Sequence, residues 1–249
     1  LTRYLSKGYH FTQDQCISIA MQLADALATV HQEGIVHRDL KTENLMLLET
    51  TPGRFSLKVL DFGIAKVMGS ADHATEHGLI FGTPEFMSPE QAYGTDIDAR
   101  ADIYAFGVVL YCMIAERLPF TGDSKLEILQ KQVDTYPPRP KRWDDSPIDL
   151  RLEAIINKCM HKDKERRYQC LTDVMTDLTL FTRDQAIVHA TSELEALELL
   201  SDKKRVLKDK GVVESRATKA LDSQINLSRS AVFEGLDLVI EDNDFGLAD

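Results

Sequence analysis

Oxygen-bearing side chains lie in a pattern that suits phosphoryl transfer. Asp39 and Asn44 are five residues apart on one polar loop, and Asp61 opens the next loop after a predicted hairpin. Because a hairpin folds back on itself, Asp61 can return to the neighbourhood of Asn44, where two oxygen ligands suit Mg²⁺. Asp39 could then accept or orient the proton of an attacking hydroxyl, and Lys41 could neutralise charge on the transferred phosphoryl group. Each residue alone is more commonly a solvated loop residue, so the interpretation depends on the joint pattern.

The residues on either side of this loop form patterns that would position it. Residues 12–15 have the form of a capping box, and apolar residues at helical spacing follow them until Gly34. We expect one amphipathic helix there, which leads through a short apolar run into the polar loop. Two short strands are expected at 45–48 and 57–60, on either side of the turn-rich stretch 50–53.

The second half of the chain is predicted to be helical. Residues 61–90 show little periodicity, and a loop of this length inside a compact domain is usually functional. An almost wholly apolar helix follows, marked by Ile103, Phe106, Gly107, Leu110 and Ile114. Further helices are expected near 126–133, 150–160 and 171–181, with 137–140 as an extended, proline-rich connector. The fold class predicted from these patterns is mainly α with a small β-hairpin.

Composition limits the class of protein. A chain of 249 residues with 43% apolar residues can bury one sizeable core. Its net charge of −11 argues against nucleic acid or an anionic membrane as the main partner, since both require a basic surface. The four cysteines are widely spaced, which favours reduced thiols in the core over disulfides or a zinc site. We find no run of about 20 apolar residues and no signal peptide, so we expect no membrane span in this segment.

Three stretches resemble the motifs of one family. His37-Arg38-Asp39-Leu40-Lys41-Thr42-Glu43-Asn44 is similar to the catalytic loop of eukaryotic-like (Hanks-type) protein kinases, and Asp61-Phe62-Gly63 to their metal-binding triplet. Residues 82–90 look like the end of the activation segment. The forms of residues 88–92 and 167–169 are closest to those of bacterial members of the family.

The resemblance covers residues 1–181 and implies a fold and a reaction. The fold would be the large, mainly helical C-terminal lobe of a protein kinase, with the small β-rich lobe missing. The protein would transfer the γ-phosphate of ATP, with Mg²⁺, to Ser or Thr hydroxyls of protein substrates. Lys41 and Thr83 are the forms typical of serine/threonine kinases rather than tyrosine kinases.

The resemblance also implies a role for each site residue. The catalytic residues would be Asp39, Lys41, Asn44, Asp61 and Thr83. ATP would be bound by Lys41, Asn44, Met46 and Asp61, with Asn44 and Asp61 on the metal and Met46 under the adenine ring. Structural support would come from His37, Phe62, Gly63, Asp102, which anchors the catalytic loop, and Arg167, which pairs with Glu90.

Regulation is implied by neighbouring residues. Arg38 precedes Asp39, and in the family such an arginine can pair with a phosphate on the activation loop. Candidate acceptors for that phosphate are Ser70, Thr75 and Ser88, of which we favour Thr75. Autophosphorylation, and self-association of the protein for it, are further expectations.

Parts of a complete kinase are not found before Leu1. No Gly-rich phosphate loop, strand lysine or partner glutamate precedes it, and turnover needs them. We therefore expect the small lobe to be encoded upstream and this chain alone to be inactive. Residues 182–249 are expected to be an acidic, partly helical tail or linker. We expect a cytoplasmic location, either for a soluble protein or for the cytoplasmic part of a larger membrane-anchored kinase.

Two other functions share parts of this pattern. A non-catalytic kinase-like scaffold would keep the lobe as an interaction surface, but the intact acidic and amide residues argue against a degenerate site. A small-molecule phosphotransferase shares the Asp…Asn…Asp arrangement, yet such enzymes lack residues 82–90 and their supports. A Gly-rich loop in the upstream sequence would separate a truncated kinase from a scaffold.

Overall fold

The computed structural model describes residues 1–61 and 83–184. By its internal contacts the chain divides into two units, Leu1–Leu178 and Thr179–Asp249, and only residues 179–184 of the second are described. The predicted boundary between residues 181 and 182 stays a prediction. Four residues named above lie outside the described ranges: Phe62, Gly63, Ser70 and Thr75.

Helix α2, Gln13–Gln32, leads to the polar loop and begins with the predicted capping box. The Thr12 hydroxyl accepts from the Gln15 amide at 3.2 Å, and the Gln15 side chain accepts from the Thr12 amide at 2.9 Å. Gly34, with a φ of +73°, follows the end of the helix, where a left-handed backbone favours glycine. Both ends of this helix are therefore confirmed.

Strands β1, Leu45–Thr51, and β2, Arg54–Val59, form one antiparallel hairpin. Leu45 pairs with Val59 at the end nearest the polar loop. At the other end the chain turns through residues 52–53. Both strands are longer than predicted, because β1 continues into the first half of the stretch that we expected to be a turn and β2 already begins at Arg54.

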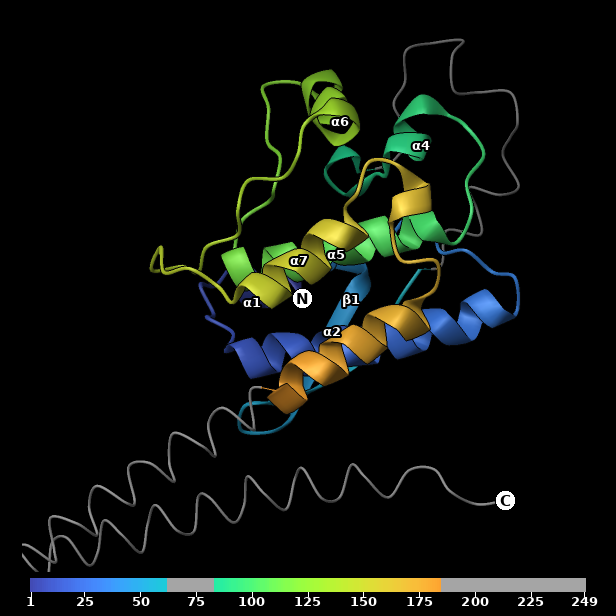
Figure 1. Cartoon of the computed structure of the whole chain (residues 1–249). Helices are drawn as coiled ribbons and strands as arrows, with labels where there is room; N and C mark the ends of the chain where they lie inside the picture. Colours follow the sequence, from blue (N-terminus) through green and yellow to red (C-terminus); the bar gives the residue numbers. More distant parts are fainter. Residues whose placement is uncertain (62–82, 185–249) are drawn as a thin grey trace, which may run out of the picture. The chain divides into compact units, whose positions relative to one another are not determined.

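Helix α5, Arg100–Ala115, crosses the middle of the first unit, with α2 and β1 below it in the view of Figure 1. Every residue from Ala101 to Ala115 is buried, as expected of a helix with almost no polar face. α5 packs against α2 and against α7, Leu150–Cys159. Gly107 permits a close approach of α7, since a Cβ at this position would lie 2.7 Å from the Cβ of Cys159.

Shorter elements complete the first unit. They are α1 (Thr2–Leu5), η1 (Thr42–Asn44), η2 (Pro84–Phe86), α4 (Pro89–Tyr93), α6 (Lys125–Asp134) and η3 (Lys164–Arg166). Helix α6 packs against α4 and η2. Of these elements only α6 was predicted, because runs of three to five residues are too short to show a helical period.

The three further helices predicted after the apolar one are confirmed, the last of them over residues 171–184. Among the described residues the only sheet is two-stranded, so the predicted class, mainly α with a small β-hairpin, is also confirmed. Within the same residues, no helix combines the length and the apolar character that crossing a membrane requires.

The cysteines follow the prediction in three of four cases. Cys16, Cys112 and Cys159 are buried and unpaired, and burial raises the pKa of the Cys16 and Cys112 thiols to about 12. Cys170 is exposed, so the prediction of a core position is wrong for this residue. It lies in a bend just before the helix that begins at residue 171, outside the apolar face of that helix.

Candidate active site

The polar loop 37–44 is held through its backbone by Asp102 of α5. The Asp102 carboxylate accepts from the His37 amide at 2.7 Å and from the Arg38 amide at 2.8 Å. His31, near the end of α2, places its Nε2 2.8 Å from the same carboxylate. Asp102 is only 1% exposed, so these contacts replace the water that a buried carboxylate loses. The loop is thus tied to a fully buried helix.

His37 joins this loop to the end of the hairpin. Its Nδ1 accepts from the Asp39 amide at 3.3 Å, and its Nε2 lies 3.3 Å from the Leu60 carbonyl oxygen. The tautomer with its hydrogen on Nε2 satisfies both contacts. Because Leu60 directly precedes Asp61, this buried imidazole links the positions of the two acidic residues.

Two residues of the site have a left-handed backbone although neither is glycine: φ is +63° at Arg38 and +52° at Asp61. This conformation costs an L residue about 1–2 kcal/mol. At Arg38 both backbone groups are held, because the amide donates to Asp102 and the carbonyl accepts from the Gln91 side chain at 2.9 Å. Strain that the surroundings maintain in this way is a frequent feature of functional sites.

Asp39, Lys41 and Thr83 converge. Lys41 Nζ lies 3.3 Å from Asp39 Oδ2 and donates to Thr83 Oγ1 at 3.1 Å. The side chains of Lys41 and Asp39 are 22% and 20% exposed, so both charged groups remain open to a ligand. One lysine therefore connects the polar loop to the segment that begins at Thr83.

Asn44 and Asp61 are brought together by the hairpin. The Leu60 amide donates to the Asn44 carbonyl at 2.8 Å, which returns the chain to Asn44 just before Asp61. Asn44 Nδ2 donates to the Asp39 carbonyl at 2.9 Å, and this leaves Oδ1 as the ligand atom of the side chain. An amide oxygen and a carboxylate are hard donors, so the two residues fit Mg²⁺. Elsewhere in residues 1–61 and 83–184, no three His, Cys, Asp or Glu side chains gather into a metal site.

Met46 lies on the open face of the hairpin. It is 41% exposed, whereas its neighbours Leu45 and Leu47 are buried. Side chains alternate along a strand, which also leaves Leu48 exposed. Met46 is therefore not a core residue of the described structure. An exposed apolar face next to Asn44 suits an apolar, planar ligand group.

Glu90 and Arg167 form a buried ion pair. Two nitrogens of the Arg167 guanidinium donate to the two Glu90 carboxylate oxygens at 2.6 and 2.7 Å. Arg167 also donates to the carbonyls of His161 and Arg100, at 2.7 and 3.0 Å. Burial by itself would raise the pKa of Glu90, but the hydrogen bonds and charge of Arg167 outweigh it and hold the pKa below its usual value. Because Arg167 is itself held by these two carbonyls, the pair fastens segment 83–90 to the start of α5 and to the residues that follow α7.

The Ser88 side chain has a structural role at the start of α4. It is fully buried and caps α4: its hydroxyl accepts from the Gln91 amide at 3.4 Å, and the Gln91 side chain accepts from the Ser88 amide at 3.0 Å. Alanine has no hydroxyl group and could not make this cap. The buried hydroxyl contradicts the candidacy of Ser88 as a phosphate acceptor in this conformation.

Comparison with known proteins identifies the family. A family model described as the protein kinase domain matches residues 1–178. The chain belongs to this family. It is 39% identical over 171 residues to the serine/threonine-protein kinase pkn3 of Myxococcus xanthus, an alignment that covers 67% of this chain and 31% of that kinase. It is 35% identical over 191 residues to the serine/threonine-protein kinase PknB of Mycobacterium leprae, covering 77% of this chain and 29% of that kinase.

These relatives confirm the resemblance to bacterial kinases of the Hanks type. The chain spans less than a third of the length of the curated relatives it matches, at 31% and 29% of the two kinases named. The match therefore concerns the kinase domain and not the other parts of those proteins.

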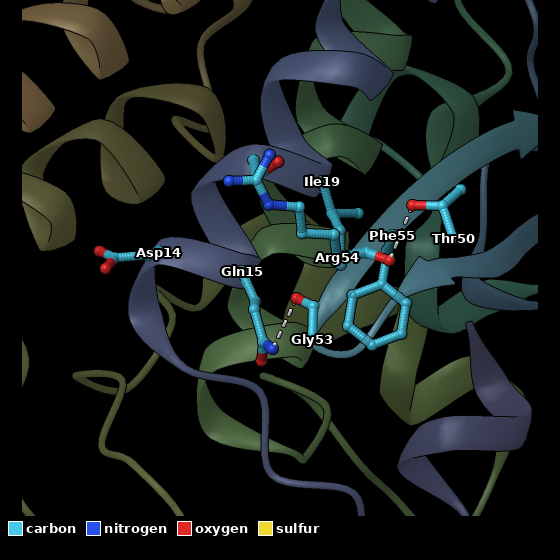
Figure 2. Close-up of a pocket in the computed structure, with 8 residues that line it drawn as sticks. Asp14, Gln15, Ile19, Thr50, Gly53, Arg54 and Phe55 are labelled. Atoms are coloured by element: carbon cyan, nitrogen blue, oxygen red, sulfur yellow. Dashed lines mark hydrogen bonds between the residues drawn. The ribbon is translucent and has the colours of Figure 1, made fainter. Parts of the chain in front are cut away.

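A surface pocket of the kinase domain is lined by residues other than those of the candidate site (Figure 2). It has a volume of about 370 Å³ and lies between the start of α2 and the turn of the hairpin. Gln15 donates to the Gly53 carbonyl at 2.9 Å across it, while Asp14 points away from the other labelled side chains. The lining residues are Asp14, Gln15, Ser18, Ile19, Thr50, Gly53, Arg54 and Phe55, and none of them is a predicted site residue.

Two glutamines contact the candidate site but were not among the predicted site residues. Gln91, whose side chain holds the Arg38 carbonyl, could have been found from the Ser-Pro-Glu-Gln form of a capping box. Gln132 of α6 gives no such signal, because it is a single polar residue in an amphipathic helix. Only the packing of α6 on η2 makes it a contact of the site.

Proposed function

We propose that the protein is a serine/threonine protein kinase, which transfers the γ-phosphate of ATP to Ser or Thr hydroxyls of proteins. The observation that carries the proposal is the convergence of Asp39, Lys41 and Thr83, in which one lysine contacts both a carboxylate and a hydroxyl 42 residues further along the chain. A solvated loop aspartate has no need of such partners.

Each side chain then has a role that its chemistry permits. Asp39 orients the acceptor hydroxyl and takes its proton, and Thr83 seats the acceptor beside it. Lys41 neutralises the negative charge that develops during transfer. Asn44 and Asp61 would hold Mg²⁺, and Lys41, Asn44, Met46 and Asp61 would contact ATP. When bound, the metal and the nucleotide supply the phosphoryl group and balance its charge.

We also propose that Arg38 responds to phosphorylation. Its Nε is buried and has no hydrogen-bond partner among the described residues, and an unpaired buried donor costs about 1–3 kcal/mol. A phosphate oxygen from the activation loop would satisfy it. Thr75, our candidate for that phosphate, lies outside the described residues, and its phosphorylation by self-association of two molecules completes this proposal.

The remaining assignments concern the whole protein. We propose that residues 1–181 act as the C-terminal lobe of the kinase, that residues 182–249 form an acidic linker, and that the domain works in the cytoplasm on protein substrates. The net charge of −11 supports proteins rather than nucleic acid as partners.

The test is transfer of labelled phosphate from ATP and Mg²⁺ by the full-length gene product, to itself and to a generic basic protein. Replacing Asp39→Asn is expected to lower the rate by about 10²–10⁴-fold, the range for loss of a general base. Asp25→Asn is the matched control, because Asp25 is exposed on α2 and is not one of the candidate site residues. Mass spectrometry then maps the phosphorylated residues, with Thr75 expected among them.

Either outcome is informative. Transfer to Ser or Thr that is lost with Asp39→Asn but kept with Asp25→Asn supports the kinase. A folded wild-type protein that binds ATP and transfers nothing would replace the kinase proposal by the non-catalytic scaffold.

A further inference from the structure

Gln132 makes a set of contacts that the motifs do not explain. It is fully buried on α6, and its Nε2 donates to the carbonyls of Pro84 and Glu85 at 3.1 and 2.6 Å. Its Oε1 accepts from the Tyr104 hydroxyl at 2.6 Å. The side-chain amide therefore uses both of its ends, and it does so on the two residues that follow Thr83.

The orientation of this amide is set by a lysine. Lys162 Nζ donates to the Tyr104 hydroxyl oxygen at 2.9 Å and to the backbone carbonyl of Gln132 at 2.7 Å. A protonated lysine can only donate, so the Tyr104 hydrogen must point to Gln132 Oε1. This leaves Gln132 Nε2 to face the two carbonyls. Reversing the amide would set its oxygen against both carbonyl oxygens.

The protonation state of Lys162 controls the directions of these hydrogen bonds. Its ammonium lies 4.5 Å from the centre of the Phe120 ring. Burial, with the charge of Arg167, lowers its pKa to about 7, although Asp134 acts in the opposite direction. A neutral amine could accept the Tyr104 hydrogen instead, and the direction of the hydrogen bonds would no longer be imposed.

The network also reaches the reacting groups. Pro84 directly follows Thr83, whose hydroxyl accepts from Lys41, and Lys41 pairs with Asp39. A shift of the two carbonyls held by Gln132 would therefore move Thr83 relative to Asp39. Within residues 1–61 and 83–184 no hydrogen bond joins the two candidate metal ligands, Asn44 and Asp61, to Gln132, Tyr104 or Lys162. A shift of Thr83 is therefore expected to act on the acceptor more than on the metal ligands.

We propose that Gln132, oriented by Tyr104 and Lys162, is a positioning residue that sets the place of η2 and, through Thr83, of the acceptor hydroxyl. This inference rests on the proposed kinase function and deepens it. It assigns to α6 a part in how tightly a protein substrate is bound.

The experiment uses Gln132→Met in the full-length gene product, since methionine keeps the length of glutamine and removes its hydrogen bonds. We expect the KM for a protein acceptor to rise about tenfold, as the loss of about 1.4 kcal/mol of hydrogen bonding implies. The KM for ATP and the hydrolysis of ATP without an acceptor are expected to stay within about twofold. Tyr104→Phe, which removes only the hydroxyl, is expected to raise the same KM by a smaller factor.

The matched control is Gln22→Met. Gln22 also binds two backbone groups of a neighbouring element, since it donates to the Phe55 carbonyl and accepts from the Leu57 amide of β2, both at 2.9 Å. The Gln22→Met variant is expected to have a lowered melting temperature, as Gln132→Met does, but an unchanged KM for the acceptor. Hydrogen exchange at the amides of Phe86 and Met87 provides a readout that needs no activity, and Gln132→Met is expected to accelerate it.

An unchanged acceptor KM and unchanged exchange in the folded Gln132→Met variant would overturn the inference. Equal losses for transfer to protein and for hydrolysis of ATP would also overturn it, because the residue would then not act on the acceptor. Failure of the proposed function is seen separately, as the absence of transfer by the wild-type protein.

Discussion

Loop 37–44 and segment 83–90 meet where Lys41 contacts Thr83, but they are held in different ways. The loop is held through its backbone, because the Asp102 carboxylate accepts from two consecutive amides. The segment is held at one end through a side chain, by the pairing of Arg167 with Glu90. At its other end Gln132 holds the backbone carbonyls of Pro84 and Glu85. The anchors thus differ in kind, one being a carboxylate on neutral amides and the other a pair of opposite charges.

The two kinds of anchor predict different effects of substitution on the loop and on the segment. The Asp102 anchor uses only backbone amides of the loop, and it fixes the geometry that a chemical step requires. Anchoring through side chains makes the position of the segment depend on groups that can be altered one at a time. We therefore expect changes at the loop anchor to lower kcat, and changes at the segment anchors to raise the KM for the acceptor.

The largest effect is expected when the charged anchor is broken. Arg167→Met leaves the Glu90 carboxylate buried without a counter-charge, which typically costs about 3–5 kcal/mol of unfolding free energy. Urea unfolding measures the loss. Adding Glu90→Gln to the variant should recover part of it, because no buried charge then remains unpaired.

A second bidentate pair, with an exposed arginine, is the control for this prediction. Arg139 donates to both carboxylate oxygens of Glu153, at 2.9 and 3.0 Å from its Nε, but the Arg139 side chain is 66% exposed. Arg139→Met is expected to cost less, because the Arg139 side chain lies largely in water and its removal uncovers the Glu153 carboxylate, which is 12% exposed in the pair. Equal losses for the two arginine variants would contradict the importance that we give to burial.

A smaller loss of stability is expected when the backbone anchor is weakened. Asp102→Asn keeps the shape of the side chain but turns an NH₂ group toward one of the two amides, at a cost of about 1.5–3 kcal/mol. Because loop 37–44 carries Asp39, we expect kcat to fall by about 10²-fold while the KM for the acceptor changes little. Steady-state kinetics over both substrates separate the two constants.

Asp98→Asn is the matched control for the loop anchor. Asp98 lies just before α5 and pairs with Arg100 and Lys164 at the surface. Its replacement is expected to leave kcat unchanged. A fall in kcat as large as that of Asp102→Asn would mean that the charge near α5, rather than the two hydrogen bonds, supports the loop.

The smallest effect is a dependence of stability on pH that comes from Lys162. Its pKa in the folded chain is lowered to about 7 by burial, while an unfolded lysine has a pKa of about 10.4. Between about pH 7 and about pH 8.5 the unfolded chain therefore binds more protons at this residue, and stability rises with pH. Above that range the buried thiols of Cys16 and Cys112, whose pKa is raised to about 12, act in the opposite direction.

Lys162→Met is expected to remove this rise, as measured by urea unfolding across the same pH range. Lys158→Met serves for comparison, because the Lys158 side chain is 49% exposed, and the rise should persist in that variant. A rise that survives in Lys162→Met would assign it to another group.

Much of the fold could be predicted where the signal is local. The capping box at Thr12, the apolar period of α2 and the unbroken apolar run of α5 depend on neighbouring residues, and these elements were found at the predicted places. The length of the hairpin was missed, because pairing partners rather than propensity decide where a strand ends.

The sequence by itself determined the identities and spacing of the candidate site residues, from Asp39 to Asp61, and the order of helices that carries them. These follow from short patterns, in which each residue constrains its neighbours. The left-handed backbone of Arg38 and the contacts of Gln132 with Pro84 and Glu85 were decided only by the tertiary structure. Both depend on groups that are distant in the chain and become neighbours only when the helices pack, so no local pattern can encode them.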